Sequence, residues 1–317
     1  MKSSTATATT ATASNNPYPP DSGYTGRFAP SPTGSLHLGS LLAAAGSFLD
    51  ARCRGGRWLV RMEDLDRERI IRGSAEEILR TLERFGLHWD GAIEYQSRRT
   101  THYLEALAGL RAAGATYECS CSRRVLTAGD ARLAGPDGRI YPGTCRSGPR
   151  RPGPTSTRFR MDGGTITLED RFQGSITFSS GSLGDVVVRR RDGVIAYQLA
   201  VVVDDALQGI TDVVRGSDLL ASTGWQLALQ RALGLPTPRH GHLPVLTEPG
   251  GAKLAKSRRS VAIEPAHAGA ELLTVLRLLN QAPPAALCGA PAPEVLGWAI
   301  AHWNPGAFRL TRQIEVK

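Results

Sequence analysis

Two segments, far apart in the chain, carry residues whose types and spacing suit phosphate binding. The first reads PSPTGSLHLGS over residues 30–40. Gly34 and Gly39 allow the backbone to approach a ligand closely, and His37 offers a hydrogen-bond donor to a phosphate oxygen. An Ala- and Leu-rich helix is expected from about Gly39 to Arg52, and the N–H groups and dipole at its N-terminus would favour an anion. A histidine packed beside a tight strand-to-helix turn is the alternative interpretation.

The second segment reads GGAKLAKSRRS over residues 250–260. Lys253 and Lys256 stand three residues apart in a loop that opens with glycines, so both ammonium groups can converge on one anion. A solvent-exposed run of charges is the alternative. Neither segment, taken alone, decides between a phosphate site and the simpler interpretation.

Three of the five cysteines lie close together in the sequence, as Cys119, Cys121 and Cys145. An odd, sparse count in a chain of 317 residues argues against a secreted disulfide scaffold, and clustering in a reducing compartment favours a metal site. Structural zinc takes four ligands, and no histidine lies between Cys121 and Cys145. Three reduced cysteines without a metal are the alternative.

The composition is that of a folded protein, and its positive charge fits binding to a polyanion. Hydrophobic residues make up 41% of the chain, and no run of about 18 apolar residues predicts a membrane span. The formal charge of +9 fits nucleic acid, although an arginine-rich composition alone would give the same excess. Residues 1–24 are polar, of low complexity, and lack the apolar core of a signal peptide. We therefore expect a disordered extension on a cytoplasmic protein without membrane contact.

The elements that must position these residues alternate along the chain. Strands are expected at 26–30 and 57–62, and helices at 74–85, 99–113, 223–233, 271–280 and 293–303. Ser74 and Glu77 form a capping-box pattern at the start of one helix. Within residues 185–205, Asp192-Gly193 predicts a hairpin turn between β-branched runs, with Asp204 and Asp205 following the second strand. The alternation predicts an α/β fold with a parallel sheet.

Together, the two phosphate-type segments resemble the paired signatures of the class I aminoacyl-tRNA synthetases. His37-Leu38-Gly39-Ser40 resembles their HIGH motif, with Ser40 in place of the last histidine, and KLAKS at 253–257 resembles KMSKS, with Ala255 in place of a serine. Further stretches resemble the glutamyl-tRNA synthetase branch: RFAPSPTG (27–34), RMEDLD (61–66), RRRDGVIAYQLAVVVDD (189–205) and VVRGSDLL (213–220). The resemblance covers residues 26–259 and implies a Rossmann-like nucleotide-binding domain.

The chemistry that this resemblance implies is ATP-dependent conversion of L-glutamate to glutamyl adenylate, with Mg²⁺. The implied catalytic residues are His37, Gly39, Lys253 and Lys256, and the implied ATP-binding residues are His37, Gly39, Ser40 and Lys256. The implied glutamate-binding residues are Arg27, Phe28, Ala29, Pro30, Ser31, Glu63, Tyr197 and Arg215. Glutamate carries one ammonium and two carboxylates, so Glu63 would pair with the ammonium and at least one arginine would hold the side-chain carboxylate. Taken singly, Glu63 as a surface ion pair, Tyr197 as a core residue and Arg215 as a solvated cation are simpler alternatives.

The cysteine pattern continues with Tyr141 and resembles the zinc site of the glutamyl-queuosine tRNA(Asp) synthetases. This resemblance implies one structural zinc on Cys119, Cys121, Tyr141 and Cys145. The segment after KLAKS is too short for the anticodon-binding domain of a full glutamyl-tRNA synthetase, as in that subfamily. The implied acceptor is queuosine at the wobble position, the implied partner is the anticodon stem-loop of tRNA(Asp), and a monomer is expected.

The expected organisation has three parts. Residues 1–24 form the disordered extension, residues 25–257 the Rossmann-like catalytic domain with an inserted zinc-containing subdomain at about 115–185, and residues 258–317 a short, mostly helical C-terminal region. Three alternatives stay open: a truncated glutamyl-tRNA synthetase that charges the 3′ end, a non-catalytic RNA-binding paralogue, and another adenylate-forming nucleotidyltransferase. Ala255 is the best support for the paralogue.

Overall fold

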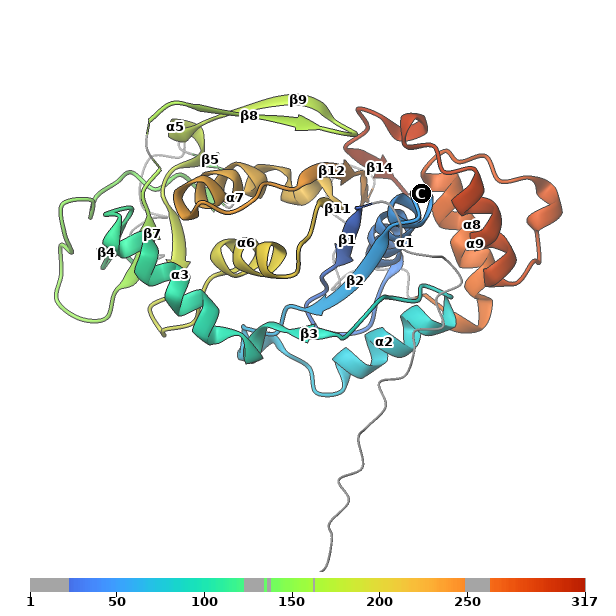
Figure 1. The fold of residues 1–317 in the computed structure, drawn as a ribbon, viewed down its shortest axis with the longest axis horizontal. Helices are drawn as coiled ribbons and strands as arrows, with labels where there is room; N and C mark the ends of the chain where they lie inside the picture. The colour runs from blue at the N-terminus through green and yellow to red at the C-terminus, as the bar shows by residue number, and fades with distance from the viewer. Residues whose placement is uncertain (1–22, 123–133, 136–137, 162, 249–262, 317) are drawn as a thin grey trace, which may run out of the picture.

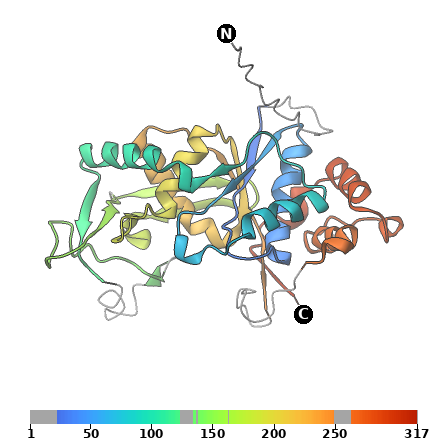
Figure 2. The same ribbon diagram turned by 90° about the horizontal axis from the view of Figure 1, so that it is seen from below.

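The computed structural model describes residues 23–122, 134–135, 138–161, 163–248 and 263–316 (Figures 1 and 2). Lys253 and Lys256, and with them the KLAKS segment, lie outside the described residues, as does nearly all of the N-terminal extension. Within the described ranges, every helix is too short or too polar to cross a membrane.

Short parallel strands form the centre of the fold: β1 (Thr25–Phe28), β2 (Arg57–Met62), β3 (Glu94–Tyr95), β11 (Asp212–Gly216) and β12 (Arg239–Leu243). β1, β2 and β3 pair in parallel in that order, and β11 pairs in parallel with β12. β11 lies beside β1, where the backbone N–H of Thr211 donates to the carbonyl oxygen of Thr25 at 2.9 Å. The order is therefore β3-β2-β1-β11-β12, and the predicted parallel sheet is confirmed.

Helices cover both faces of this sheet (Figure 1). One side holds α1 (Leu38–Arg52), α8 (Ala268–Leu278) and α9 (Ala292–Ala301), with α2 (Ser74–Arg84) near β3; the other holds α3 (Thr100–Ala112), α6 (Tyr197–Leu207) and α7 (Leu220–Leu233). Buried apolar side chains form one large core on each side. Leu41, Phe48 and Trp58 belong to the first, and Leu199, Val202 and Leu229 to the second.

The connections place a topological switch between β1 and β11. From β1 the chain passes through α1 to β2 on one side, and it returns much later to β11 on the other side of β1. Open parallel sheets bind ligands beyond the carboxyl ends of their strands at such a switch. The loop after Phe28 and the end of β11 near Arg215 therefore frame the expected binding position.

A second group of strands is inserted between α3 and α6: β4 (Thr116–Cys119), β5 (Ala134–Gly135), β6 (Gly138–Arg139), β7 (Ser156–Phe159), β8 (Thr165–Asp170), β9 (Gly174–Ser179) and β10 (Val186–Arg189), with the short helix α5 (Ser180–Leu183). β10, β7 and β4 form an antiparallel sheet. β8 and β9 form a long hairpin that runs along α7 back to β12 (Figure 1). Near the C-terminus, β14 (Gln313–Glu315) pairs in parallel with β13 (Val245–Thr247).

The predicted hairpin over residues 185–205 is wrong in its second half. The turn exists, since the N–H of Arg190 donates to the carbonyl oxygen of Val194 at 2.7 Å and Gly193 has a φ of 90°. From Tyr197, however, the chain is the helix α6, which carries Asp204 and Asp205. Its valines favour a strand locally, but the helix is buried between α3, α7 and the sheet, and this packing outweighs β-propensity.

The predicted capping box at Ser74 is also wrong. Gly73 is the N-cap residue of α2, and no side chain caps this helix. The Ser74 hydroxyl instead accepts from the N–H of Gly34 and donates to the carbonyl oxygen of Gly34, both at 2.9 Å. Ser74 thus fixes the loop that precedes α1, at a glycine whose φ of 127° suits no other residue well.

Candidate functional site

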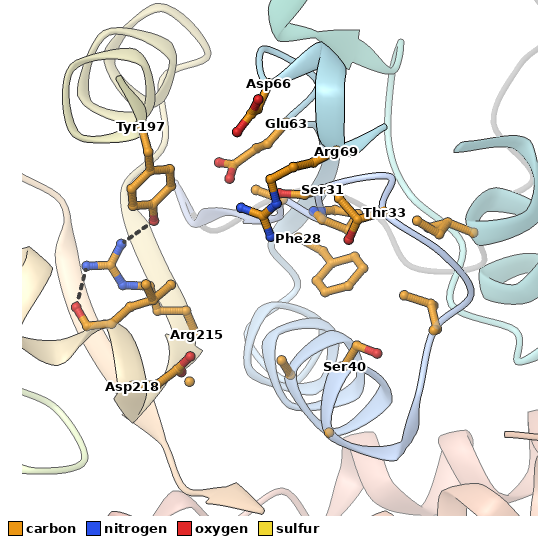
Figure 3. A pocket seen from close by; sticks show the side chains of 18 of the residues that line it. Phe28, Ser31, Thr33, Ser40, Glu63, Asp66, Arg69, Tyr197, Arg215 and Asp218 are labelled. Carbon is orange, nitrogen blue, oxygen red and sulfur yellow. Dashed lines mark hydrogen bonds between the residues drawn. The ribbon is translucent and has the colours of Figure 1, made fainter. Parts of the chain in front are cut away.

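A cavity of about 670 Å³ opens at the carboxyl ends of β1 and β11 (Figure 3). It is lined by every predicted glutamate- or ATP-contacting residue within the described ranges: Arg27, Phe28, Ala29, Pro30, Ser31, His37, Gly39, Ser40, Glu63, Tyr197 and Arg215. These residues come from β1 and its following loop, α1, the end of β2, α6 and β11. The fold therefore brings the predicted residues into one space of a size that suits a small-molecule ligand.

His37 organises the start of α1. It is the N-cap residue, and its Nδ1 accepts from the N–H groups of Gly39 at 3.1 Å and Ser40 at 3.3 Å. The Ser40 hydroxyl completes a reciprocal cap by accepting from the N–H of His37 at 2.7 Å. Because Nδ1 is an acceptor, the neutral ring carries its proton on Nε2, which is then a donor. In this structure His37 therefore accepts from the N–H groups of Gly39 and Ser40, and the predicted contact of these two residues with ATP stays a prediction.

Gly39 is required by this cap. A Cβ at position 39 would lie 3.1 Å from Cε1 and 3.2 Å from Nδ1 of His37, closer than ordinary van der Waals contact. A side chain at position 39 would therefore require the imidazole to shift by a few tenths of an ångström. The spacing His-x-Gly thus follows from the geometry of a histidine N-cap.

Glu63 lies beside a buried network of charges. Its carboxylate is 3.7 Å from Arg61, which also contacts Asp205 at 2.8 Å, and Asp205 contacts Nε of Arg27 at 3.1 Å. Burial raises the pKa of Glu63 to about 7, against the effect of Arg61 and Arg27. Burial also opposes ionisation of Asp205, but Arg27 and Arg61 outweigh it and hold its pKa at about 2. Asp205 is therefore the permanent anion of the network, and Glu63 is poised to ionise when a cation binds.

Tyr197 and Arg215 form the opposite wall of the cavity (Figure 3). Nη1 of Arg215 donates to the Tyr197 hydroxyl at 3.3 Å. Burial raises the pKa of Tyr197, so the phenol keeps its proton and can donate. The two side chains present a guanidinium N–H and a hydroxyl together, which suits a carboxylate.

Other residues of the cavity do not stand out in the sequence. Thr33, Asp66, Arg69 and Asp218 also line it, and the guanidinium of Arg69 points into the space between the Tyr197 wall and α1 (Figure 3). The signal for Asp66 and Arg69 was their position within and just after RMEDLD. Asp205, expected only to follow a strand, lies in the buried, apolar helix α6, where a carboxylate requires a cation as partner.

A separate cluster joins Cys119, Cys121, Tyr141 and Cys145. The three sulfur atoms lie within 4.8 Å of one another, and the Cys121 and Cys145 sulfurs are 3.6 Å apart. The Tyr141 oxygen is 3.4 Å from the Cys119 sulfur and 3.7 Å from that of Cys121. A tetrahedral ion with metal–sulfur distances of about 2.3 Å would hold its ligand atoms about 3.5–3.8 Å apart. The four predicted ligands therefore meet in an arrangement that can hold a metal ion.

Comparison with known proteins shows which family the chain belongs to. Residues 25–271 match the sequence model of the family described as "tRNA synthetases class I (E and Q), catalytic domain". The chain is 51% identical over 286 residues to the glutamyl-Q tRNA(Asp) synthetase of Dechloromonas aromatica, covering 90% of this chain and 95% of that protein. The chain belongs to the glutamyl-Q tRNA(Asp) synthetase family. The protein of the same name from Pseudomonas aeruginosa is 50% identical over 292 residues, covering 92% of this chain and 96% of that protein.

The class I synthetase fold of this family member is also seen in solved structures. A glutamate tRNA ligase from Elizabethkingia meningosepticum, in complex with its amino acid, superposes with a TM-score of 0.73 at 25% identity. The match covers 91% of this chain but only 66% of that chain. A glutamate-tRNA synthetase from Elizabethkingia anophelis gives a TM-score of 0.74 at 25% identity, with 92% and 68% covered.

Proposed function

We propose that this glutamyl-Q tRNA(Asp) synthetase family member activates L-glutamate with ATP, without tRNA, and transfers the glutamyl group to queuosine at the wobble position of tRNA(Asp). In the first step, an α-carboxylate oxygen attacks the α-phosphorus of ATP and pyrophosphate leaves. In the second step, a hydroxyl of the queuosine base attacks the acyl carbon and AMP leaves. The observation that carries the proposal is the convergence of Glu63, Tyr197 and Arg215 with the His37-capped helix in one cavity.

The charges of the cavity support an assignment of the parts of glutamate. Glu63 would receive the ammonium group, and Arg215 with Tyr197 would receive the side-chain carboxylate. The α-carboxylate would then face α1, where Nε2 of His37 offers a donor to a phosphate oxygen. Lys253 and Lys256 would neutralise the phosphates, and Mg²⁺ would accompany ATP as in phosphoryl transfer generally.

The first experiment measures glutamate-dependent exchange of labelled pyrophosphate into ATP in the absence of tRNA. We expect exchange with glutamate and at most trace exchange with glutamine, since an amide lacks the charge that Arg215 would bind. The absence of exchange with any amino acid would favour the non-catalytic paralogue. Exchange only after tRNA is added would contradict tRNA-independent activation.

The pKa of Glu63 predicts how glutamate affinity depends on pH. Only the ionised carboxylate attracts the ammonium group, and burial places its pKa at about 7 without ligand. The KM for glutamate should therefore fall as the pH rises from about 6 to about 8 and then level off. Glu63→Gln should raise the KM and remove this dependence. A wild-type KM that stays constant over this range would contradict the role of Glu63.

We also propose that Cys119, Cys121, Tyr141 and Cys145 hold one structural zinc ion. The thiolates suit zinc, and the guanidinium of Arg158 lies 3.9 Å from the centre of the Tyr141 ring, where it favours the negatively charged phenolate. Zinc would fix the inserted β4–β7 region without taking part in the reaction. The boundaries of this subdomain, at about 115–185, remain a prediction, as do those of the three parts of the chain.

Metal analysis of the purified protein should give about one zinc per chain. Cys119→Ser should lose the metal and speed hydrogen exchange in residues 115–122 and 138–150, because the ion joins segments far apart in the sequence. Cys288→Ser is the matched control, since Cys288 is exposed and outside the cluster. Native protein that is fully active without metal would contradict the proposal.

A further inference from the structure

Arg215 is held from behind by side chains that do not reach the cavity. Its Nη2 donates to Thr223 Oγ1 and to Gln226 Oε1 on α7, each at 2.7 Å. Its Nε donates to Nε2 of His242 at 3.2 Å. These contacts leave Nη1 as the edge of the guanidinium that points toward Tyr197 and the cavity. Only the Nη1 edge of the Arg215 guanidinium is therefore available to a ligand. The rotation of the guanidinium decides whether Nη1 faces that ligand.

His242 stands directly opposite Arg215 in the neighbouring strand β12. Its Nδ1 lies 2.5 Å from Oδ2 of Asp170, and both side chains are fully buried. The carboxylate accepts a hydrogen bond from Nδ1–H, whereas the guanidinium donates a hydrogen bond to Nε2, so the ring is neutral with its proton on Nδ1. In agreement, burial lowers the pKa of His242 to about 4, outweighing Asp170. The three residues form one directed chain of hydrogen bonds from carboxylate to imidazole to guanidinium.

Asp170 is itself immobilised at the tip of the β8–β9 hairpin. Its Oδ1 accepts from the backbone N–H groups of Phe172 at 3.0 Å, Gln173 at 2.8 Å and His242 at 3.2 Å. Gln173 Nε2 also donates to the carbonyl oxygen of His242 at 2.7 Å. The hairpin, which belongs to the inserted region, thus reaches the catalytic sheet and delivers a fixed carboxylate behind Arg215.

We propose that Asp170 and His242 are positioning residues for amino-acid recognition, which hold Arg215 so that Nη1 faces the side-chain carboxylate of glutamate. Neither residue lines the cavity, so both would act on glutamate only through Arg215. Burying a carboxylate and an imidazole costs desolvation free energy. Their hydrogen bonds lead to the guanidinium of Arg215, which indicates that the pair serves to orient it. The inference rests on the proposed function, in that it assumes that Arg215 binds glutamate.

Asp170→Asn tests the proposal because it keeps the shape of the side chain while it removes the negative charge and reverses the hydrogen bond to His242. Asn keeps an oxygen for the three backbone N–H groups but presents an NH₂ group to His242. The imidazole must then accept a hydrogen bond at Nδ1 and carry its proton on Nε2. Two N–H donors, Nε2 of His242 and Nε of Arg215, would then face each other. We expect the KM for glutamate in pyrophosphate exchange to rise roughly 10- to 100-fold, the worth of one hydrogen bond to a charged group. The KM for ATP should stay nearly unchanged.

Two variants of His242 give the conservative comparison. His242→Gln keeps an amide oxygen that can accept from Arg215, so its KM for glutamate should stay near that of the wild type. His242→Leu removes the acceptor and should resemble Asp170→Asn. Equal effects of glutamine and leucine would contradict a role for the acceptor at this position.

Asp50→Asn controls for loosening of the hairpin tip. Asp50 is fully buried and binds Arg171, the neighbour of Asp170, at 2.7 Å, but it does not contact His242. It should lower stability without a selective change in the KM for glutamate. If Asp50→Asn matched Asp170→Asn, or if Asp170→Asn changed the KM for ATP as much as that for glutamate, the inference would be overturned. If Arg215→Ala itself left the KM for glutamate unchanged, the assignment of Arg215 in the proposed function would fail instead.

Discussion

Replacing Arg215 by alanine is expected to lower kcat/KM for glutamate in pyrophosphate exchange by roughly 100-fold or more. The guanidinium is buried, and its Nη1 edge and the Tyr197 hydroxyl form one wall of the cavity. Removing one partner of a buried, hydrogen-bonded charge pair costs about 2–5 kcal/mol, because the remaining charge stays desolvated. Here the remaining charge would be the side-chain carboxylate of glutamate. Most of the loss should therefore appear in the KM for glutamate.

Arg239→Ala is a matched control for this prediction. Arg239 lies at the start of the neighbouring strand β12 and pairs with Asp212 at 2.7 Å, but 63% of its side chain is exposed. The guanidinium of Arg239 is solvated, and the buried carboxylate of Asp212 keeps Arg171 as a partner at 3.3 Å, so the loss of Arg239 should cost little. Its loss should leave glutamate activation nearly unchanged. If Arg215→Ala lowered the rate at saturating glutamate but left the KM unaltered, Arg215 would act on the reacting phosphate or on the fold rather than on the amino acid.

The sequence predicted the core of the site because short motifs carry both its chemistry and its local geometry. RFAPSPTG and the His-x-Gly segment correctly placed a strand, a turn and the start of a helix, and Arg27, His37 and Gly39 lie on one cavity. The parallel sheet followed from the alternation of segments. Its order, with β11 beside β1, depends on contacts between residues about 185 positions apart, and no local pattern predicts these.

The errors share one physical cause, which is that tertiary contacts outweigh local preferences. Val201, Val202 and Val203 favour a strand, yet they lie in a buried helix. Ser74 has the pattern of a helix cap, but its hydroxyl binds the backbone of Gly34 instead. The link from Asp170 through His242 to Arg215 joins three strands from two regions of the chain, so none of its members stands out in the sequence.

Replacing queuosine by guanosine in the acceptor tRNA should abolish glutamyl transfer almost completely. The adenylate would be fixed between the Arg215 wall and α1, so the attacking hydroxyl must enter the same cavity, which Arg69 also lines. We expect tRNA(Asp) with queuosine at the wobble position to accept glutamate and the same tRNA with guanosine to accept none, because guanosine lacks the hydroxyls of the modified base. The isolated queuosine-bearing anticodon stem-loop should also be sufficient.

Binding of this stem-loop should weaken steeply with salt. The chain carries a formal charge of +9, and basic side chains that contact phosphates release counterions on binding. A queuosine-bearing stem-loop that failed to accept glutamate, while the whole tRNA succeeded, would show that contacts outside the anticodon arm are needed.

The position of labelled glutamate on tRNA(Asp) tests directly whether queuosine, and not the 3′ end, accepts the glutamyl group. Queuosine-bearing tRNA(Asp) without its 3′-terminal adenosine, which leaves the modified base intact, is incubated with ATP, labelled glutamate and the enzyme. The tRNA is then cleaved, and the masses of its fragments are measured by mass spectrometry. We expect the glutamyl mass on the anticodon-loop fragment that holds queuosine. Labelling that requires the 3′ adenosine, and that appears on the 3′ fragment of intact tRNA, would make the protein a conventional glutamyl-tRNA synthetase and contradict the account.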